Sequence, residues 1–365
     1  MDVYFNAMKI KFDILSNLAS SIFDNNHIDS VNFFINLDDI NSKFRNVKCN
    51  QQFQCCGAGA FKQYASNVFN LAAHYRQWLH RNHAKSRIFI YYTSASCGFL
   101  ANSIINGYRK GFAERSSLSN ADSYYVNMTI NGGTELVKDI SKYIDGVYLI
   151  DSKGEEPSVI PYLISETHPA DWNFILTKDR LELQYCNYDK FSILYPSSRY
   201  GHRLINSANL WSFIAEKESI SSSHASQYNP KLFNAILGIV GNGVRNVPKV
   251  KKIGWRTVFE YLEDIWENNK DHSIETMISE LESKISSKNS SALDQSITNA
   301  LVLNMRSVYN SMSETNKEYI LMQLIDIPDI ESLNQINRDP MLLGNWPINL
   351  QFLTQQSSSF KKKVW

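Results

Sequence analysis

The chain has 365 residues, of which 43% are hydrophobic, and this combination predicts a folded protein of two or three domains with a sizeable core. Its 37 lysines and arginines nearly balance 36 aspartates and glutamates, so the formal charge is +1. A near-neutral chain lacks the broad basic field of a protein that binds polyanions through bulk electrostatics, and low net charge favours self-association.

The spacing of apolar residues in 1–30 predicts an N-terminal helical arm. Charged residues at positions 2, 9, 11 and 13 interrupt its apolar residues, which argues against a signal peptide or a membrane span. We expect this arm to be exchanged between subunits, because an exchanged element makes the contacts that it would make on its own chain. Deleting residues 1–28 is then expected to leave a folded protein that no longer assembles.

Residues 31–205 predict an α/β domain with a mostly parallel sheet covered by helices on both faces. Short β-branched and aromatic runs predict strands, and apolar residues every three to four positions predict helices between them. The predicted strands are 31–38, 86–96, 124–130, 147–152 and 172–179, and the predicted helices are 61–82 and 135–144. Alternation of this kind is typical of a sheet buried on both sides.

Residues 206–327 show helical spacing only, so the second half predicts an α-helical region. The tail, 328–365, is irregular, with three prolines, a QQSSS stretch and three consecutive lysines before its end.

The cysteines are an odd number in a large chain and show no Cys-x-x-Cys spacing. This pattern argues against a zinc site and a disulfide-dense secreted scaffold, and it favours intracellular synthesis with free thiols. An odd count also permits a bridge between subunits, for which the candidates are Cys49, Cys55, Cys56, Cys97 and Cys186.

Five segments, taken in order, resemble the flap endonuclease and 5′-exonuclease family, the helix-rich branch of the PIN-like nucleases. They read FFINLDDIN, GYRKGFAERS, GEEPSVIPYLI, NFILTKDRLELQY and VGNGVRNVPKVKKIGWRTV, and they fall within residues 30–265. The resemblance implies a PIN-like α/β fold. It also implies a helix-hairpin-helix segment at 240–262, of the kind that grips duplex DNA through backbone amides, and backbone contacts in the second segment from Tyr108, Arg109 and Lys110.

The family's chemistry needs a dense carboxylate cluster, because two divalent ions must be neutralised while they activate water. The resemblance places Asp38, Glu155 and Asp179 at three ligand positions. Non-acidic residues occupy the others, namely Tyr92-Thr93-Ser94, Pro157-Ser158, Leu181, Asn242 and Arg245. Three scattered acids near an arginine are not expected to hold two magnesium ions. We therefore expect no enzyme activity and no metal or other cofactor, with the three acids acting as helix caps or at strand ends.

Two further clusters carry residue types that bind phosphates or metals. A vestigial nucleic-acid contact could form at Lys249, Lys251, Lys252 and Arg256, although the neutral chain argues against it. His74, His80 and His83 lie on or just after one helix, but no second group supplies further ligands for a metal.

A neutral, aromatic-rich chain with a degraded nuclease site is similar to nudivirus occlusion-body proteins, the polyhedrins. This resemblance implies a structural protein that self-assembles into a crystalline occlusion body around virions, in the nucleus or cytoplasm of an infected cell. Its partners would be itself and virions, with neither membrane nor nucleic acid. Two alternatives stay open: a flap-endonuclease-like nuclease or DNA-binding accessory protein using Asp38, Glu155 and Asp179, and a virion or replication scaffold.

Overall fold

The structure is a computed structural model that describes residues 5–44, 58–94, 103–105, 120–197, 199, 201–269, 271–287 and 290–324. Tyr108, Arg109, Lys110, Cys49, Cys55, Cys56 and Cys97 lie outside these residues, as does the tail from 325 onward.

A single six-stranded sheet forms the centre of the α/β part, in the order β3-β2-β1-β4-β5-β6. Five strands are parallel, and β6 pairs antiparallel with β5. The strands are β1 (Ser30–Asn36), β2 (Lys85–Tyr92), β3 (Val147–Asp151), β4 (Trp172–Leu176), β5 (Phe191–Tyr195) and β6 (Arg203–Ile205). Their apolar residues are continuous because both faces are buried. The predicted mostly parallel sheet is confirmed, whereas β5 and β6 were not predicted.

Alternate residues of β1 belong to two separate hydrophobic clusters. Phe33 and Ile35 face a cluster with α2 (Phe12–Phe23), α4 (Ala58–Arg81) and α7 (Asn120–Ser141). Phe34 faces the other cluster, which continues through α8 (Ile160–Thr167) into the C-terminal helices. The period of two along a strand thus divides the core into two layers.

The strand predicted at 124–130 is wrong, because these residues lie inside α7. Close packing of α7 on α4 overrides the β-propensity of this Tyr- and Val-containing segment. A Cβ atom added at Gly133 would lie 2.4 Å from the Tyr64 ring, and one at Gly132 would lie 2.7 Å from Phe61. The two glycines therefore let the helix backbones approach.

The N-terminal arm packs on its own chain in this structure. Tyr75 on α4 donates its hydroxyl to the Met8 carbonyl and accepts a bond from the Ile10 amide. Phe12 stacks on His74 with ring centroids 4.6 Å apart, and the Arg81 guanidinium lies 4.4 Å from the Phe12 ring. Exchange of the arm between subunits stays a prediction.

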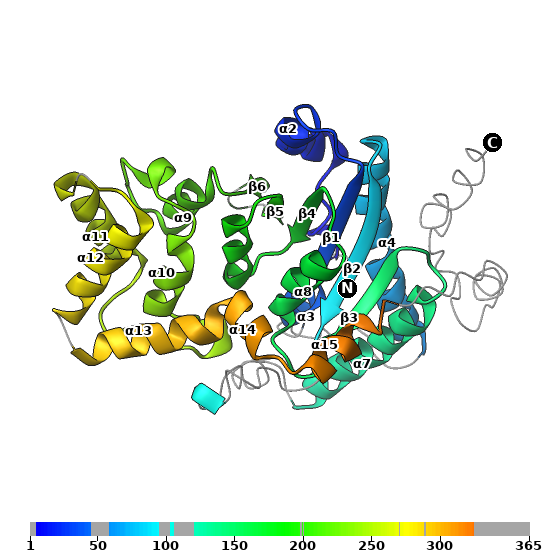
Figure 1. The fold of residues 1–365 in the computed structure, drawn as a ribbon. Coiled ribbons are helices and arrows are strands. Elements are labelled where there is room, and N and C mark those ends of the chain that lie inside the picture. The colour runs from blue at the N-terminus through cyan, green and yellow to red at the C-terminus, as the bar shows by residue number, and fades with distance from the viewer. Residues whose placement is uncertain are drawn as a thin grey trace.

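The described part of the C-terminal half contains α-helices and short 3₁₀ turns, as predicted. Helices α9 to α12 lie on the β6 side of the sheet, away from α4 and α7 (Figure 1). The helices are α9 (Leu210–Glu218), α10 (Leu232–Val240), α11 (Trp255–Asn268), α12 (Ile274–Ser286), α13 (Ser290–Leu303), α14 (Met305–Ser311) and α15 (Glu314–Leu321).

One buried glutamine joins the helical half to the sheet. Gln184 lies in η2 (Arg180–Asn187); its Nε2 donates to the Leu303 carbonyl at 3.0 Å and its Oε1 accepts from the Met305 amide at 2.8 Å. The bond pair fixes the junction of α13 and α14, and α15 lies beside β3 (Figure 1). None of the described helices is long and apolar enough to span a bilayer.

Candidate functional site

Acidic residues gather at the carboxyl edge of the parallel sheet. Asp38 and Asp39 follow β1, Asp151 ends β3, and the neighbouring turns carry Glu155, Glu156, Asp179 and Glu182. The strand order reverses between β1 and β4, which is where open α/β sheets form their binding crevice. The three acids predicted from the sequence therefore lie on the expected edge.

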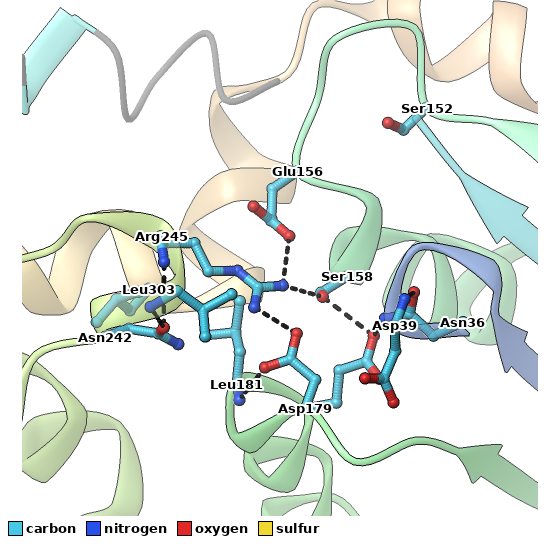
Figure 2. A network of polar contacts seen from close by, with 12 residues as sticks. Asn36, Asp39, Ser152, Glu156, Ser158, Asp179, Leu181, Asn242, Arg245 and Leu303 are labelled. Atoms are coloured by element: carbon cyan, nitrogen blue, oxygen red, sulfur yellow. Dashed lines mark hydrogen bonds and ion pairs between the residues drawn. The ribbon is translucent and has the colours of Figure 1, made fainter. Parts of the chain in front are cut away.

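Arg245 enters this acidic group from the turn between α10 and α11. Its Nη2 lies 3.0 Å from Glu156 Oε1 and donates to Ser158 Oγ at 3.3 Å, while its Nη1 pairs with Asp179 Oδ2 (Figure 2). The side chains of Arg245 and Glu156 are each 2% exposed, and that of Asp179 is 11% exposed. The result is a buried ion pair network, here called the Arg245 centre, made of Arg245, Glu156, Ser158 and Asp179.

The turn that carries Arg245 is built locally. Asn242 Oδ1 accepts from the amides of Val244 and Arg245 at 3.0 and 3.2 Å, as an N-cap does. Asn242 also pairs with Val247 through two 2.9 Å backbone bonds, and Asn246 takes the left-handed conformation that closes the turn. Asn242 thus caps the turn with an amide oxygen and brings no charge.

Glu182 extends the network through its hydrogen bond from Ser158. It is fully buried, and its Oε1 accepts from Asn36 Nδ2 at 2.7 Å, from Ser158 Oγ at 3.0 Å and from the Tyr91 hydroxyl. Burial, reinforced by the charge of Asp179, raises the pKa of Glu182 to about 8. Sequence reasoning missed Glu182; the only signal was an acid between two leucines.

The acids after β1 and β4 stabilise backbone at the strand ends. Asp38 is 8% exposed and lies in the first turn of α3 (Leu37–Phe44). Its neighbour Asp39 accepts from the Lys178 amide at 2.7 Å, which ties the end of β1 to the end of β4. Asp179 caps η2 through a 3.0 Å bond from the Leu181 amide, in addition to its ion pair.

Helix α15 covers the acids after β3. Asn316 donates to Glu155 Oε1 at 2.7 Å, and burial raises the pKa of Glu155. Gln323, two residues after α15, accepts from the Asp151 amide and donates to the Asp151 carbonyl, both at 2.9 Å. Glu155 therefore bonds to a residue near the end of the described chain. Glu156, which the sequence analysis did not single out, forms the ion pair with Arg245.

The family resemblance implies a two-ion centre at this edge, and the distances between the acids bear on it. Within the described ranges, no three His, Cys, Asp or Glu side chains at the sheet edge bring ligand atoms within 4.8 Å of one another. Two of the acids are paired with a guanidinium, which supplies the positive charge that a metal would supply.

The remaining predicted residues lie elsewhere. Lys249, Lys251, Lys252 and Arg256 are exposed around the start of α11. Cys186 is a fully buried free thiol whose pKa burial raises far above its ordinary value. A bridge from Cys186 to another subunit stays a prediction, and complete burial argues against it. His74 bonds to the Ile10 carbonyl at 2.7 Å and belongs to none of the convergent metal-ligand groups of the described residues.

No family model matches the sequence, and no curated protein matches it either. Solved structures do match. A pseudo-enzyme–product complex of bacteriophage T5 flap endonuclease with DNA and metal ions is 12% identical, with 80% of this chain and 98% of that chain covered and a TM-score of 0.51. The T5 5′-exonuclease with bound zinc gives the same values. A T5 protein co-crystallised with metal ions is 14% identical, with 80% and 99% covered and a TM-score of 0.50. The chain thus has a flap-endonuclease-like, PIN-like α/β fold, and identity at this level shows the fold alone.

Proposed function

We propose that this chain is a non-catalytic protein on a flap-endonuclease-like fold, in which the Arg245 centre replaces a metal centre. The observation that carries the proposal is the buried guanidinium between Glu156 and Asp179 (Figure 2). A divalent ion there would face a fixed positive charge and would have to take both carboxylates from the arginine. Stripping a buried arginine of its partners costs about 3–5 kcal/mol, which opposes metal binding.

One structural neighbour offers a parallel. A T5 flap endonuclease that carries lysine in place of an aspartate is described as a pseudo-enzyme. Arg245 among the acids of this chain adds a positive charge of the same kind. The parallel supports the loss of catalysis.

The finer part of the proposal is that the protein self-assembles into a crystalline occlusion body that encases virions. Two observations support a packing role. The formal charge of +1 leaves little electrostatic repulsion between copies. Acids of the sheet edge are bound by Arg245, Asn316 and a backbone amide, so the chain's own groups occupy carboxylates that a ligand would need.

A cleavage assay tests the catalytic part. Purified full-length chain is incubated with a 5′-flap duplex and Mg²⁺ or Mn²⁺, and we expect no metal-dependent cleavage. Asp179→Asn is the matched variant, since trace cleavage by a contaminant would persist in it. Cleavage by the natural chain that is lost in Asp179→Asn would overturn the proposal.

Expression of the chain alone in eukaryotic cells tests assembly. Electron microscopy of thin sections is expected to show bodies with a regular lattice. A soluble monomer by light scattering would refute the packing role, and a discrete complex with a second protein would favour a scaffold.

A DNA-binding accessory protein is the second candidate, favoured by the four exposed cations around the start of α11. Fluorescence anisotropy with a labelled duplex distinguishes it. Binding that weakens in a Lys251→Ala, Lys252→Ala double variant would support this candidate, and absence of binding at low salt would exclude it.

A further inference from the structure

A second polar cluster, which shares no residue with the Arg245 centre, lies where the segment between α9 and α10 packs on α11. Glu263 and Glu267 are four residues apart on α11, so they share one helix face. His224 comes from the turn before η3 (Ala225–Gln227). The cluster therefore joins two elements, and neither of them carries the acids of the sheet edge.

The three side chains converge. His224 Nδ1 lies 2.7 Å from Glu263 Oε2, and one ligand atom from each of His224, Glu263 and Glu267 lies within 4.8 Å of the others. His224 and Glu263 are half-buried, and Glu267 is exposed. The ion pairs of the described residues give neither glutamate a lysine or arginine partner. Two carboxylates therefore face one imidazole, which leaves the group with negative charge.

Neighbouring side chains hold Glu263 in place. Its Oε1 accepts from the Tyr228 hydroxyl at 2.8 Å and from Ser222 Oγ, and its Oε2 accepts from Ser223 Oγ at 3.0 Å. Burial alone would raise the pKa of Glu263, but hydrogen bonds from Ser222, His224 and Tyr228 lower it to about 2. The same hydrogen bonds fix the carboxylate in position beside His224.

The imidazole of His224 is also oriented. Its ring stacks on Trp266, with centroids 5.9 Å apart and planes at 25°, and His272 stacks on Trp266 at 3.8 Å. Outer contacts that fix a ring and a carboxylate are what a metal site needs before the ion arrives.

We propose that His224, Glu263 and Glu267 bind one divalent transition-metal ion of the Zn²⁺ class. One imidazole nitrogen and two carboxylate oxygens are ligands that such ions accept, with solvent completing the coordination on the exposed Glu267 side. An ion between Nδ1 and Oε2 requires the imidazole tautomer that carries its proton on Nε2. Because ligand bonds are ~2.0–2.2 Å long, the 2.7 Å gap would widen by less than ~1 Å.

Bound metal would fasten the segment around His224 to α11, and because the three ligands meet only in the folded chain, it would stabilise the fold. The proposal does not depend on the proposed function, since no residue is shared with the Arg245 centre.

The experiment uses the full chain freed of metal by a chelator, with Co²⁺ as an optical probe and Zn²⁺ for thermal unfolding. We expect one Co²⁺ per chain with visible d–d absorption, and a rise in Tm with Zn²⁺. Glu267→Gln, at an exposed position, is expected to weaken Co²⁺ binding ~10-fold or more and to abolish the Tm rise. Tyr228→Phe, which removes a support of Glu263, is expected to weaken binding ~10- to 100-fold.

Two matched controls separate this site from adventitious binding: Glu280→Gln on α12 and His27→Gln near the N-terminus, both exposed. Both are expected to bind Co²⁺ as the natural chain does. Equal binding by the natural chain and Glu267→Gln, or absence of a d–d spectrum at saturating Co²⁺, would overturn the proposal.

Discussion

At the residue scale, Arg245 is the side chain on which the sheet edge depends. It neutralises two acids that come from different strand ends, and Ser158 passes the connection on to Glu182. A buried charge network of this kind is costly to interrupt, because removing one member leaves the others unpaired.

Arg245→Leu is therefore expected to lower the free energy of unfolding by about 3–5 kcal/mol, since Glu156 and Asp179 lose their cation. Urea unfolding at neutral pH measures the change. Arg203→Leu is the matched control, because the Arg203–Glu216 pair is 41% and 51% exposed and should contribute less than about 1 kcal/mol. Equal losses in the two variants would contradict the role given to Arg245.

Glu182 makes stability depend on pH. Its pKa is about 8 in the folded chain and close to the ordinary 4.5 in the unfolded chain. Between these values the folded protein holds a proton that the unfolded chain has released, so the free energy of unfolding falls as pH rises from about 4.5 to 8. Glu182→Gln keeps a polar group of the same shape and is expected to flatten this fall. Unfolding curves from pH 5 to 9 check it, and parallel slopes for both proteins would disprove it.

At the element scale, α15 and the residue that follows its last turn close the β3 side of the sheet. Gln323 bonds both backbone groups of Asp151, as a neighbouring strand would, and Asn316 holds Glu155. Strand β3 is an edge strand, and a side chain that satisfies its end protects it from pairing with another chain.

Gln323→Ala is expected to speed hydrogen exchange at the Asp151 amide and to cost about 1–3 kcal/mol for two lost hydrogen bonds. Amide exchange followed by NMR measures this directly. Glu314→Ala, at a side chain 81% exposed in the first turn of α15, is the control and should leave the Asp151 amide unchanged. An unaltered exchange rate of the Asp151 amide in Gln323→Ala would show that Gln323 does not hold the end of α15 on β3.

At the scale of the whole molecule, the sheet separates two hydrophobic layers, and the N-terminal arm completes one of them. Phe5, Met8, Ile10, Leu15 and Ile22 are each at most 3% exposed. Burying such a side chain contributes about 1.5–3 kcal/mol, and a domain has only about 5–15 kcal/mol in total. The arm is part of the core.

Deletion of residues 1–28 is therefore expected to prevent folding, in place of the folded, non-assembling protein that the sequence suggested. Circular dichroism and urea titration test this. A cooperative transition with a native spectrum would show that the arm is dispensable. If the arm is exchanged between copies, a peptide of residues 1–28 added in trans should restore folding.

Sequence periodicity located β1, β2, β3 and β4 along the chain, the long α4 helix and the helical second half, because these depend on which residues must leave water. It also placed a strand at 124–130, where the structure has a helix. Chain position also placed acids at the sheet edge, since parallel strands end on one side. The turn at 242–247 was indicated only through the family resemblance, although the contacts that close it, from Asn242 and Asn246, are local.

Tertiary structure decided what each acid does. Glu155 and Glu156 are adjacent in sequence, yet one meets Asn316 and the other meets Arg245, 89 residues away. The pKa of Glu182 follows from complete burial, and the helical state of 124–130 follows from close packing on α4. Local pattern determines which elements form, because their hydrogen bonds are local. Contacts between side chains that are distant in the sequence depend on how the layers pack. A single sequence does not record that packing.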